Sequence, residues 1–260
     1  MMTKLMKMFL IAIGMLAFPA IPAHAVGGGV VSILKCLPGP VQQVDPIVSP
    51  GGALSEHMHQ FFGGKGIQPP GTETTVAGMQ TGGTTCPLSS DTAGYWVPTL
   101  HRADGTIIAP TQMNIYYRSP KGKTVQAFPE GFGMVCGIEP RPGCEQVETQ
   151  GGSGWGCSDS EGFHSIAEAL PCSSVLIGHV QMKPIDQTLP KVTLHVRYKL
   201  TTCDGCYISS DMGAPGGSTL HGDFWNTWDQ GVLARVVAAL NAGKSCKGMT
   251  DKNLSCLPVV

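Results

Sequence analysis

The sequence predicts a mainly β protein: a single β-sandwich-like or jelly-roll-like domain with one C-terminal helix, stapled by disulfides. Three observations lead to this prediction. The chain has 35 glycines and 20 prolines in 260 residues and is only 13% charged, which is typical of short strands joined by turns. Apolar and polar residues alternate strictly in KVTLHVRYK, residues 191–199. Ten cysteines follow a stretch that has the features of an export signal.

The first 25 residues are predicted to be a signal peptide outside the fold. Two lysines precede the apolar stretch MFLIAIGMLAF, which is too short to span a bilayer, and AHA at residues 23–25 fits the pattern read by signal peptidase. Residues 26–260 are then the secreted domain, in which no segment reaches the roughly 20 apolar residues of a membrane helix. We therefore expect a secreted protein, extracellular or periplasmic, without a membrane span in the mature chain.

All ten cysteines lie after the expected cleavage point. An even number in an exported chain is typical of a disulfide framework. The only CxxC pair is Cys203-Asp-Gly-Cys206. No second pair is present to complete a zinc ribbon, so a local turn disulfide is favoured over a redox-active pair or a metal site.

Taken in chain order, the first half of the domain reads as strands separated by one long loop. VGGGVVSILKC predicts a strand that ends at Cys36, and residues 66–94 predict a polar loop pinned by Cys86. Residues 95–119 predict two or three strands, with Asp104-Gly105 as the strongest hairpin turn in the sequence.

The second half begins with a predicted loop over residues 139–157 and continues with strands over 174–182 and 191–199. The segment NTWDQGVLARVVAALNAG then predicts the helix. Thr227 and Gln230 fit a capping box, an apolar stripe runs from Val232 to Leu240, and Gly243 suits the residue after the helix end.

The overall charge and the aromatic content restrict the class of partner. A formal net charge of −1 gives no electrostatic attraction toward nucleic acid or an anionic membrane surface. Four tryptophans and five tyrosines on a weakly charged chain suit a neutral ligand. We expect a polysaccharide or other glycan as partner, and no nucleic acid.

Two short segments each place two chemically capable side chains one residue apart. The segments HMH and HGD carry His57 with His59 and His221 with Asp223, and this spacing puts both members of a pair on one face of a strand. Three imidazoles and a carboxylate can complete the shell of a divalent metal. Asp45 would be a further ligand, a general base, or a partner that orients a histidine. These five residues are the candidate catalytic residues, and the candidate cofactor is a divalent metal at the two pairs.

Other interpretations use the same residues. A histidine beside a carboxylate can act as acid or base without a metal, as in a lyase or glycosidase, and a glycosidase pair of carboxylates would come from Asp45, Glu56 and Asp223. Alternatively, the polar residues only hydrogen-bond loops around a turn. A copper site on a mature N-terminal histidine would need cleavage before His24, where the signal-peptidase pattern is poorer.

Aromatic residues accompany both pairs and predict a ligand-contacting surface. Aromatic faces stack on sugar rings, although they also fill protein cores. The candidate substrate-binding residues are Phe62, Trp96, Tyr117, Phe224 and Trp225.

Several longer segments match family-specific patterns. VDPIVSPGGALSEHMHQFFGG, residues 44–64, contains Asp-Pro-Ile-Val, then Pro-Gly, then Ser-x-His-x-His and a Phe-x-Gly tail. TTCPLSSDTAGYWVPTL, NIYYR, VQAFPEGFGMVCG and LHGDFWNTWDQGVL follow later in the chain. These blocks resemble those of the domain-of-unknown-function family 1996, a group of secreted fungal and bacterial proteins. The chain resembles a divergent member, because the family's Cys-Trp-Asp-Gly block is missing after VLIGHVQMK.

The resemblance implies a cell-wall or polysaccharide role, since family members often accompany carbohydrate-binding modules. We expect a secreted carbohydrate-active protein that binds or cleaves a cell-wall or extracellular polysaccharide through the His/Asp cluster, as a glycoside hydrolase or polysaccharide lyase would. The alternatives are a non-catalytic structural or adhesive secreted protein and a metal-dependent enzyme of another class.

The export signal gives the first testable prediction. N-terminal sequencing of protein recovered outside the cytoplasm should begin at Val26. A mature pool that retains the full precursor would contradict the signal-peptide assignment, and a start at His24 would restore the copper interpretation.

Overall fold

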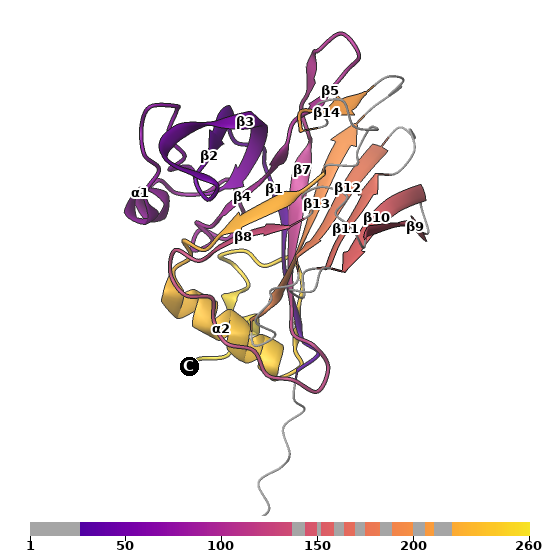
Figure 1. Ribbon diagram of the computed structural model, residues 1–260. Coiled ribbons are helices and arrows are strands. Elements are labelled where there is room, and N and C mark those ends of the chain that lie inside the picture. The colour runs from indigo at the N-terminus through magenta and orange to yellow at the C-terminus, as the bar shows by residue number, and fades with distance from the viewer. Residues whose placement is uncertain are drawn as a thin grey trace, which may run out of the picture.

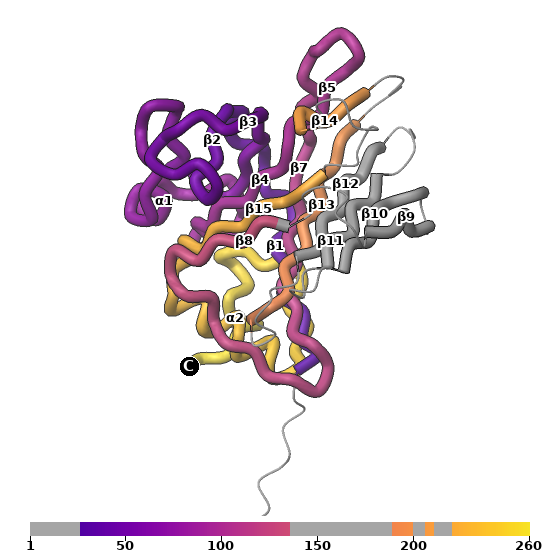
Figure 2. Tube along the Cα trace, viewed as in Figure 1, coloured from indigo at the N-terminus to yellow at the C-terminus, as the bar shows by residue number. Residues whose placement is uncertain are grey.

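The computed structural model of the chain describes residues 27–136, 189–199, 206–210 and 220–260, and the backbone of four further strands between residues 144 and 182 (Figures 1 and 2). The predicted signal peptide lies outside these residues. Among the described residues, no helix is long and apolar enough to cross a membrane.

Within the described residues the strands form three sheets. The largest contains β1 (Val30–Cys36), β7 (Gln112–Arg118), β9 (Cys144–Thr149), β10 (Gly152–Ser158), β11 (His164–Ala169), β12 (Val175–Met182), β13 (Lys191–Lys199) and β16 (Ser245–Cys246), in the order β16-β1-β7-β13-β12-β11-β10-β9. The second contains β2 (Val41–Asp45), β3 (Ser49–Gly63), β4 (Gly94–Pro98), β8 (Gly133–Cys136) and β15 (Gly222–Trp225), in the order β2-β3-β4-β15-β8. The third is small and contains β5 (Leu100–His101), β6 (Ile107–Ile108) and β14 (Tyr207–Ile208).

The main hydrophobic core lies between the first two sheets, which makes the fold mainly β and sandwich-like, as predicted. Ile33, Ile115 and Leu194 come from the large sheet, and Tyr95 and Phe224 come from the five-stranded sheet; all are fully buried in one cluster. The strand at residues 191–199 has the predicted bounds, and its apolar residues point into this core because side chains alternate across a strand.

Two helical assignments differ from the sequence prediction. Helix α2 (Gln230–Asn241) packs at one end of the large sheet (Figure 1), but its N-cap is Asp229, whose carboxylate accepts from the Val232 N–H. Thr227 is not the cap, because its hydroxyl donates to the Thr92 carbonyl. In addition to the predicted helix, a short one, α1 (Val76–Thr81), and a 3₁₀ turn, η1 (Leu254–Cys256), lie in the described chain.

The predicted loops also need correction. The segment 66–94 contains α1, and the segment 139–157 contains β9 and most of β10. Residues 95–119 form four strands, not two or three. Ladder hydrogen bonds use backbone groups alone, so a glycine-rich or polar segment becomes a strand wherever a partner strand lies beside it. The predicted hairpin at Asp104-Gly105 does form, with Gly105 at a φ of +85°.

Two disulfides staple the described chain. Cys36–Cys86 closes a loop with a sequence separation of 50, and Cys246–Cys256 closes one of 10. Because it closes the longer loop, the Cys36–Cys86 disulfide is expected to stabilise the fold by about 4 kcal/mol through loop-closure entropy. These disulfides agree with an extracellular protein. Cys206 is a free thiol, so the predicted Cys203–Cys206 disulfide is wrong; Cys203 itself lies outside the described residues.

A buried hydrogen-bond network joins the two large sheets. The Tyr95 hydroxyl of β4 donates to Asp91 Oδ1 at 2.8 Å and also contacts the Tyr117 hydroxyl of β7 at 2.5 Å. Trp228 Nε1 donates to the same Tyr117 oxygen at 2.9 Å. Burial raises the pKa of Asp91 to about 8, with the Tyr95 hydrogen bond opposing the shift. The network therefore holds a protonated carboxyl group at neutral pH.

This proton makes stability depend on pH. The folded chain keeps it up to about pH 8, whereas the unfolded chain releases it near pH 3.8. The stabilising contribution of Asp91 to the free energy of unfolding is therefore fully present below pH 3.8. It falls as pH rises from 3.8 toward 8 and is lost above about pH 8. Denaturant titrations at several pH values measure the free energy of unfolding. Asp91→Asn should remove the decrease of this free energy between pH 3.8 and 8 that Asp91 causes. An unchanged decrease in the variant would contradict the assignment.

Candidate metal centre

Strand register brings the two predicted pairs together on one face of the five-stranded sheet. His59 of β3 lies opposite Pro98 of β4, and Asp223 of β15 lies opposite Trp96 of the same strand. Because β3 and β15 both pair with β4, His59 and His221 fall on either side of Pro98, one row along from Asp223. Residues 61 and 225, two positions further along their strands, continue the same face toward the β2–β3 turn.

The three histidine rings converge through their Nε2 atoms. His221 Nε2 lies 3.1 Å from His57 Nε2 and 3.4 Å from His59 Nε2. Ligand atoms of the three rings all lie within 4.8 Å of one another. Two nitrogens bound to one tetrahedral Zn²⁺ at ordinary bond lengths are about 3.3 Å apart. The two distances from His221 Nε2 therefore match those between ligands of one ion.

The tautomer of His59 is fixed by its other nitrogen. His59 Nδ1 donates to the Val44 carbonyl oxygen at 2.9 Å, so the neutral ring carries its lone pair on Nε2. This is the orientation that a hydrogen-bonded backbone carbonyl gives to metal-binding histidines. One proton on His221 Nε2 cannot serve both short contacts, to His57 Nε2 and to His59 Nε2, equally well. A cation between the rings would interact with all three Nε2 atoms.

Two carboxylates complete the cluster. Asp45, His59 and Asp223 form a second group whose ligand atoms lie within 4.8 Å of one another. Asp45 Oδ1 accepts from the backbone N–H groups of Ile47 and Val48 at 2.9 and 3.0 Å, which fixes its side chain. Asp223 is 0% exposed, and neither of its oxygens has a hydrogen-bond partner. It lies 3.8 Å from His221 Nε2.

Burial dominates the electrostatics of the cluster. It lowers the pKa of His59 to about 2, with further lowering from His221 and His57 and an opposing effect of the Val44 carbonyl. It also lowers the pKa of the half-buried His57, against the attraction of Asp45 and Glu56. Burial, followed by repulsion from Asp45, raises the pKa of Asp223 well above its usual range. Every shift favours the uncharged form, which is the expected response of polar groups placed together without a counter-ion.

The donor set fits a divalent cation. Three neutral imidazoles and two ionised carboxylates would carry a charge of −2, which one divalent ion balances. Imidazole with carboxylate suits Zn²⁺ and neighbouring transition metals. An unpaired buried carboxylate is otherwise costly. Asp223 is therefore the side chain whose position a bound cation best explains.

The structure thus brings together all five residues predicted to be catalytic, while their catalytic role stays a prediction. Glu56 lies outside the cluster, is exposed, and acts on His57 only through its charge. The backbone carbonyl of Val44 was missed, because no side-chain pattern marks a carbonyl that holds a ring. The aromatic neighbour Phe61 was noted beside the first pair but was not predicted as a site residue; its ring lies 6.2 Å from His59.

The predicted substrate-binding aromatics need correction. Phe62, Tyr117 and Phe224 are at most 1% exposed and belong to the main core. Phe62 and Phe224 alternate with the cluster residues along β3 and β15 and so point to the opposite face. Tyr117 comes from β7 of the large sheet. Trp96 is also fully buried, within a second small hydrophobic cluster beneath the site. Trp225 is half-buried and lines a surface pocket.

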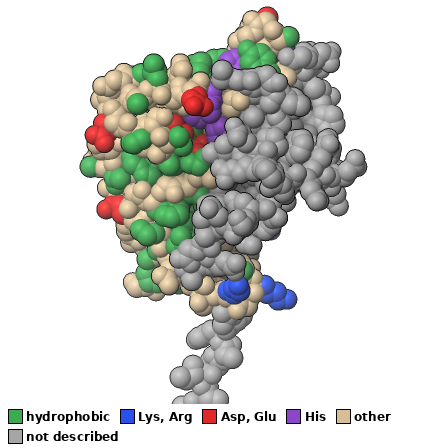
Figure 3. All heavy atoms as spheres, viewed as in Figure 1, with side chains coloured by type: hydrophobic (Ala, Val, Ile, Leu, Met, Phe, Trp, Pro, Cys, Tyr) green, Lys and Arg blue, Asp and Glu red, His purple; other side chains and the backbone are tan. Residues whose placement is uncertain are grey.

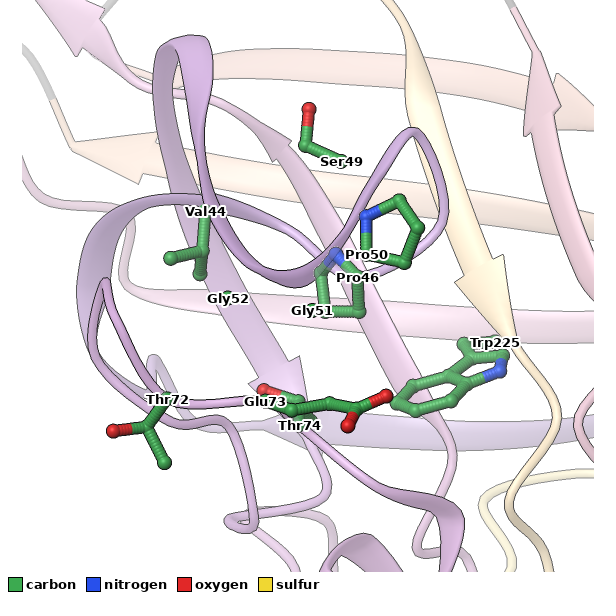
Figure 4. A pocket seen from close by; sticks show the side chains of 10 residues that line it. All are labelled: Val44, Pro46, Ser49, Pro50, Gly51, Gly52, Thr72, Glu73, Thr74 and Trp225. Atoms are coloured by element: carbon green, nitrogen blue, oxygen red, sulfur yellow. The ribbon is translucent and has the colours of Figure 1, made fainter.

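That pocket lies next to the His/Asp cluster. It has a volume of about 170 Å³ and is lined by Pro46, Pro50, Thr72, Glu73, Thr74 and Trp225, among others (Figure 4). Val44 also lines it, and the carbonyl of the same residue holds His59. The half-buried His57 keeps the cluster itself close to solvent, and histidine and acidic side chains gather at the surface in Figure 3.

The fold and the cluster define a disulfide-stapled, β-sandwich-like protein with a candidate three-histidine metal centre. The chain belongs to the family described as Domain of unknown function (DUF1996), whose model matches residues 45–184. This span begins at Asp45 and includes His57 and His59, but it ends before His221 and Asp223. No curated protein and no solved structure matches the chain.

The cluster predicts a specific response to metal. Chelator-treated protein titrated with Zn²⁺ should bind one ion per chain, and an ion at 100 times its dissociation constant should add about 2.7 kcal/mol to the free energy of unfolding. Calorimetric titration and denaturant unfolding measure the two effects. His59→Ala should abolish both, whereas His101→Gln, a histidine outside the cluster, should bind normally.

Asp223→Asn distinguishes a metal site from a structural network. In metal-free protein burial keeps the Asp223 carboxyl uncharged. The change then replaces one neutral buried group by another of similar size, so stability should change little. In the same variant the stabilisation by Zn²⁺ should largely disappear. A destabilised metal-free variant that still binds the ion normally would show that Asp223 serves the fold instead.

Proposed function

We propose that this chain is a secreted metal-dependent enzyme that hydrolyses bonds in an extracellular or cell-wall polysaccharide. The observation that carries the proposal is the convergence of three histidine Nε2 atoms beside the buried carboxylate of Asp223, which has no hydrogen-bond partner. A divalent ion in such a site supplies a Lewis acid and lowers the pKa of bound water toward neutrality.

The residues of the chain have separate roles in this proposal. His57, His59 and His221 would hold the ion. The buried carboxylate of Asp223, 3.8 Å from His221 Nε2, would offset its charge. This set would leave a position for water. Asp45 is fixed by two backbone N–H groups and is close enough to the cluster to accept a proton from water. His57 is the half-buried member, so substrate would reach the ion from its side.

A metal-free glycosidase is less well supported. Its two carboxyl groups must flank the scissile bond, with one of them in contact with the leaving oxygen. Asp45 and Asp223 are 4% and 0% exposed, so neither is presented to a sugar in that way. Glu56 is exposed but is not accompanied by a second accessible carboxylate in the cluster.

Turnover tests the proposal directly. The purified mature chain, loaded in turn with Zn²⁺, Mn²⁺, Fe²⁺, Co²⁺ and Ni²⁺, is incubated with β-glucan, chitin, chitosan and acetylated xylan, and released sugars and acetate are measured. We expect product that disappears with chelator and returns with metal. Asp45→Asn should lower kcat at least 100-fold while Zn²⁺ binding persists, because the residue acts as base.

The controls separate enzyme from binding protein. Glu130→Gln, an exposed carboxylate outside the cluster, should retain full activity. Activity that survives both chelation and His59→Ala would overturn the metal mechanism. Stoichiometric metal binding without turnover of any substrate would instead support a non-catalytic secreted protein.

A further inference from the structure

We propose that the pocket beside the cluster is a sugar subsite, in which one pyranose ring of a glycan stacks on Trp225 and donates hydroxyl hydrogen bonds to Glu73. This inference deepens the proposed function by naming where the substrate chain is held. The inference depends on the proposed function only where it concerns hydrolysis. Sugar binding in the pocket requires no metal and can be tested without turnover.

The shape of the pocket is fixed by close backbone contact between two loops. Gly71 N–H donates to the Gly52 carbonyl at 2.8 Å. A side-chain carbon on Gly52 would lie 2.7 Å from the backbone of Thr72, and Gly52 has a φ of +79°. Only glycine permits this approach. The turn of the β2–β3 hairpin and the loop before α1 therefore form a pocket that exists before any ligand arrives.

One wall of the pocket is a held aromatic ring. Trp225 is half-buried, and its Nε1 donates to the Gly131 carbonyl at 3.0 Å, which fixes the indole. Its neighbours across β4 and β3 are Gly94 and Gly63, which have no side chains to cover the ring. The negative face of an indole attracts the weakly positive C–H groups on the face of a sugar ring.

The opposite wall supplies hydrogen-bond acceptors. Glu73 is exposed and points toward the Trp225 indole in Figure 4. A carboxylate accepts strong, charge-assisted hydrogen bonds from hydroxyl groups. Thr72 and Thr74 add further polar groups to the lining. A flat apolar ring opposite a carboxylate matches a molecule with a C–H face and a hydroxylated edge, which is a pyranose.

The position of the pocket places its ligand next to the reaction site. Trp225 is two residues from Asp223 on β15, so their Cα atoms are about 7 Å apart on the same sheet face. Val44 contributes to the pocket, and its carbonyl orients His59. A glycan with one unit on Trp225 would therefore extend its neighbouring unit toward the His/Asp cluster.

Binding to metal-free protein tests the subsite apart from catalysis. Calorimetric titrations with cellotetraose and with fully deacetylated chitosan tetraose distinguish a neutral sugar from an amino sugar. We expect at least one of them to bind, with affinity reduced tenfold or more by Trp225→Ala and by Glu73→Ala. Tyr207→Ala, an exposed aromatic on β14, is the matched control and should bind as the unaltered chain does.

The outcomes separate this inference from the proposed function. Glu73 lies on an exposed loop, so Glu73→Ala remains informative if Trp225→Ala fails to fold. Binding that is unchanged in His59→Ala but lost in Glu73→Ala supports the subsite whether or not turnover is found. Failure of both oligosaccharides to bind, or equal binding by Glu73→Ala and the unaltered chain, would overturn it.

Discussion

The pairing of β3 and β15 with the same strand, β4, is the constraint on which the candidate site depends. Strands β3 and β15 are separated by more than 150 residues of sequence, yet their registers place His59 opposite Pro98 and Asp223 opposite Trp96 of the same strand β4. A slip of one residue in either pairing would turn the histidines toward the main core. The register is fixed because the alternate residues Phe62 and Phe224 are buried on the opposite face.

The five-stranded sheet therefore has two faces with different roles. One face contributes aromatic residues to the main core and joins the large sheet through the buried network around Tyr95 and Tyr117. The other face contains a small apolar cluster around Phe61 and Trp96. The polar residues of the candidate site, His59 and Asp223 among them, lie beside this cluster on the same face. The strong packing on the first face allows the second to hold groups that do not stabilise the fold by themselves.

Burying the histidine and aspartate side chains of the cluster side by side costs free energy, which a bound cation would offset. Neutral imidazole nitrogens face one another at hydrogen-bond distance, and a buried carboxylate lies beside them. Both Asp223 oxygens are buried and without a hydrogen-bond partner, and such an arrangement beside three imidazoles points to function more than to stability. The adjoining pocket adds an aromatic wall and an exposed carboxylate. The proposed metal site and the proposed sugar subsite both involve Val44, which lines the pocket and whose carbonyl holds His59.

The sequence by itself determined the local features whose causes are local. Alternation predicted β13, and the Asp-Gly dipeptide predicted the β5–β6 turn. The i, i+2 spacing predicted that His57 shares a strand face with His59, and His221 with Asp223. Tertiary structure alone decided the rest. Phe62 and Phe224 are core residues, not ligand contacts, because the face that a strand buries depends on the sheet packed against it. The Val44 carbonyl, the lack of a hydrogen-bond partner for Asp223 and the pocket at Trp225 arise from contacts between distant segments, and no pattern within one segment encodes them.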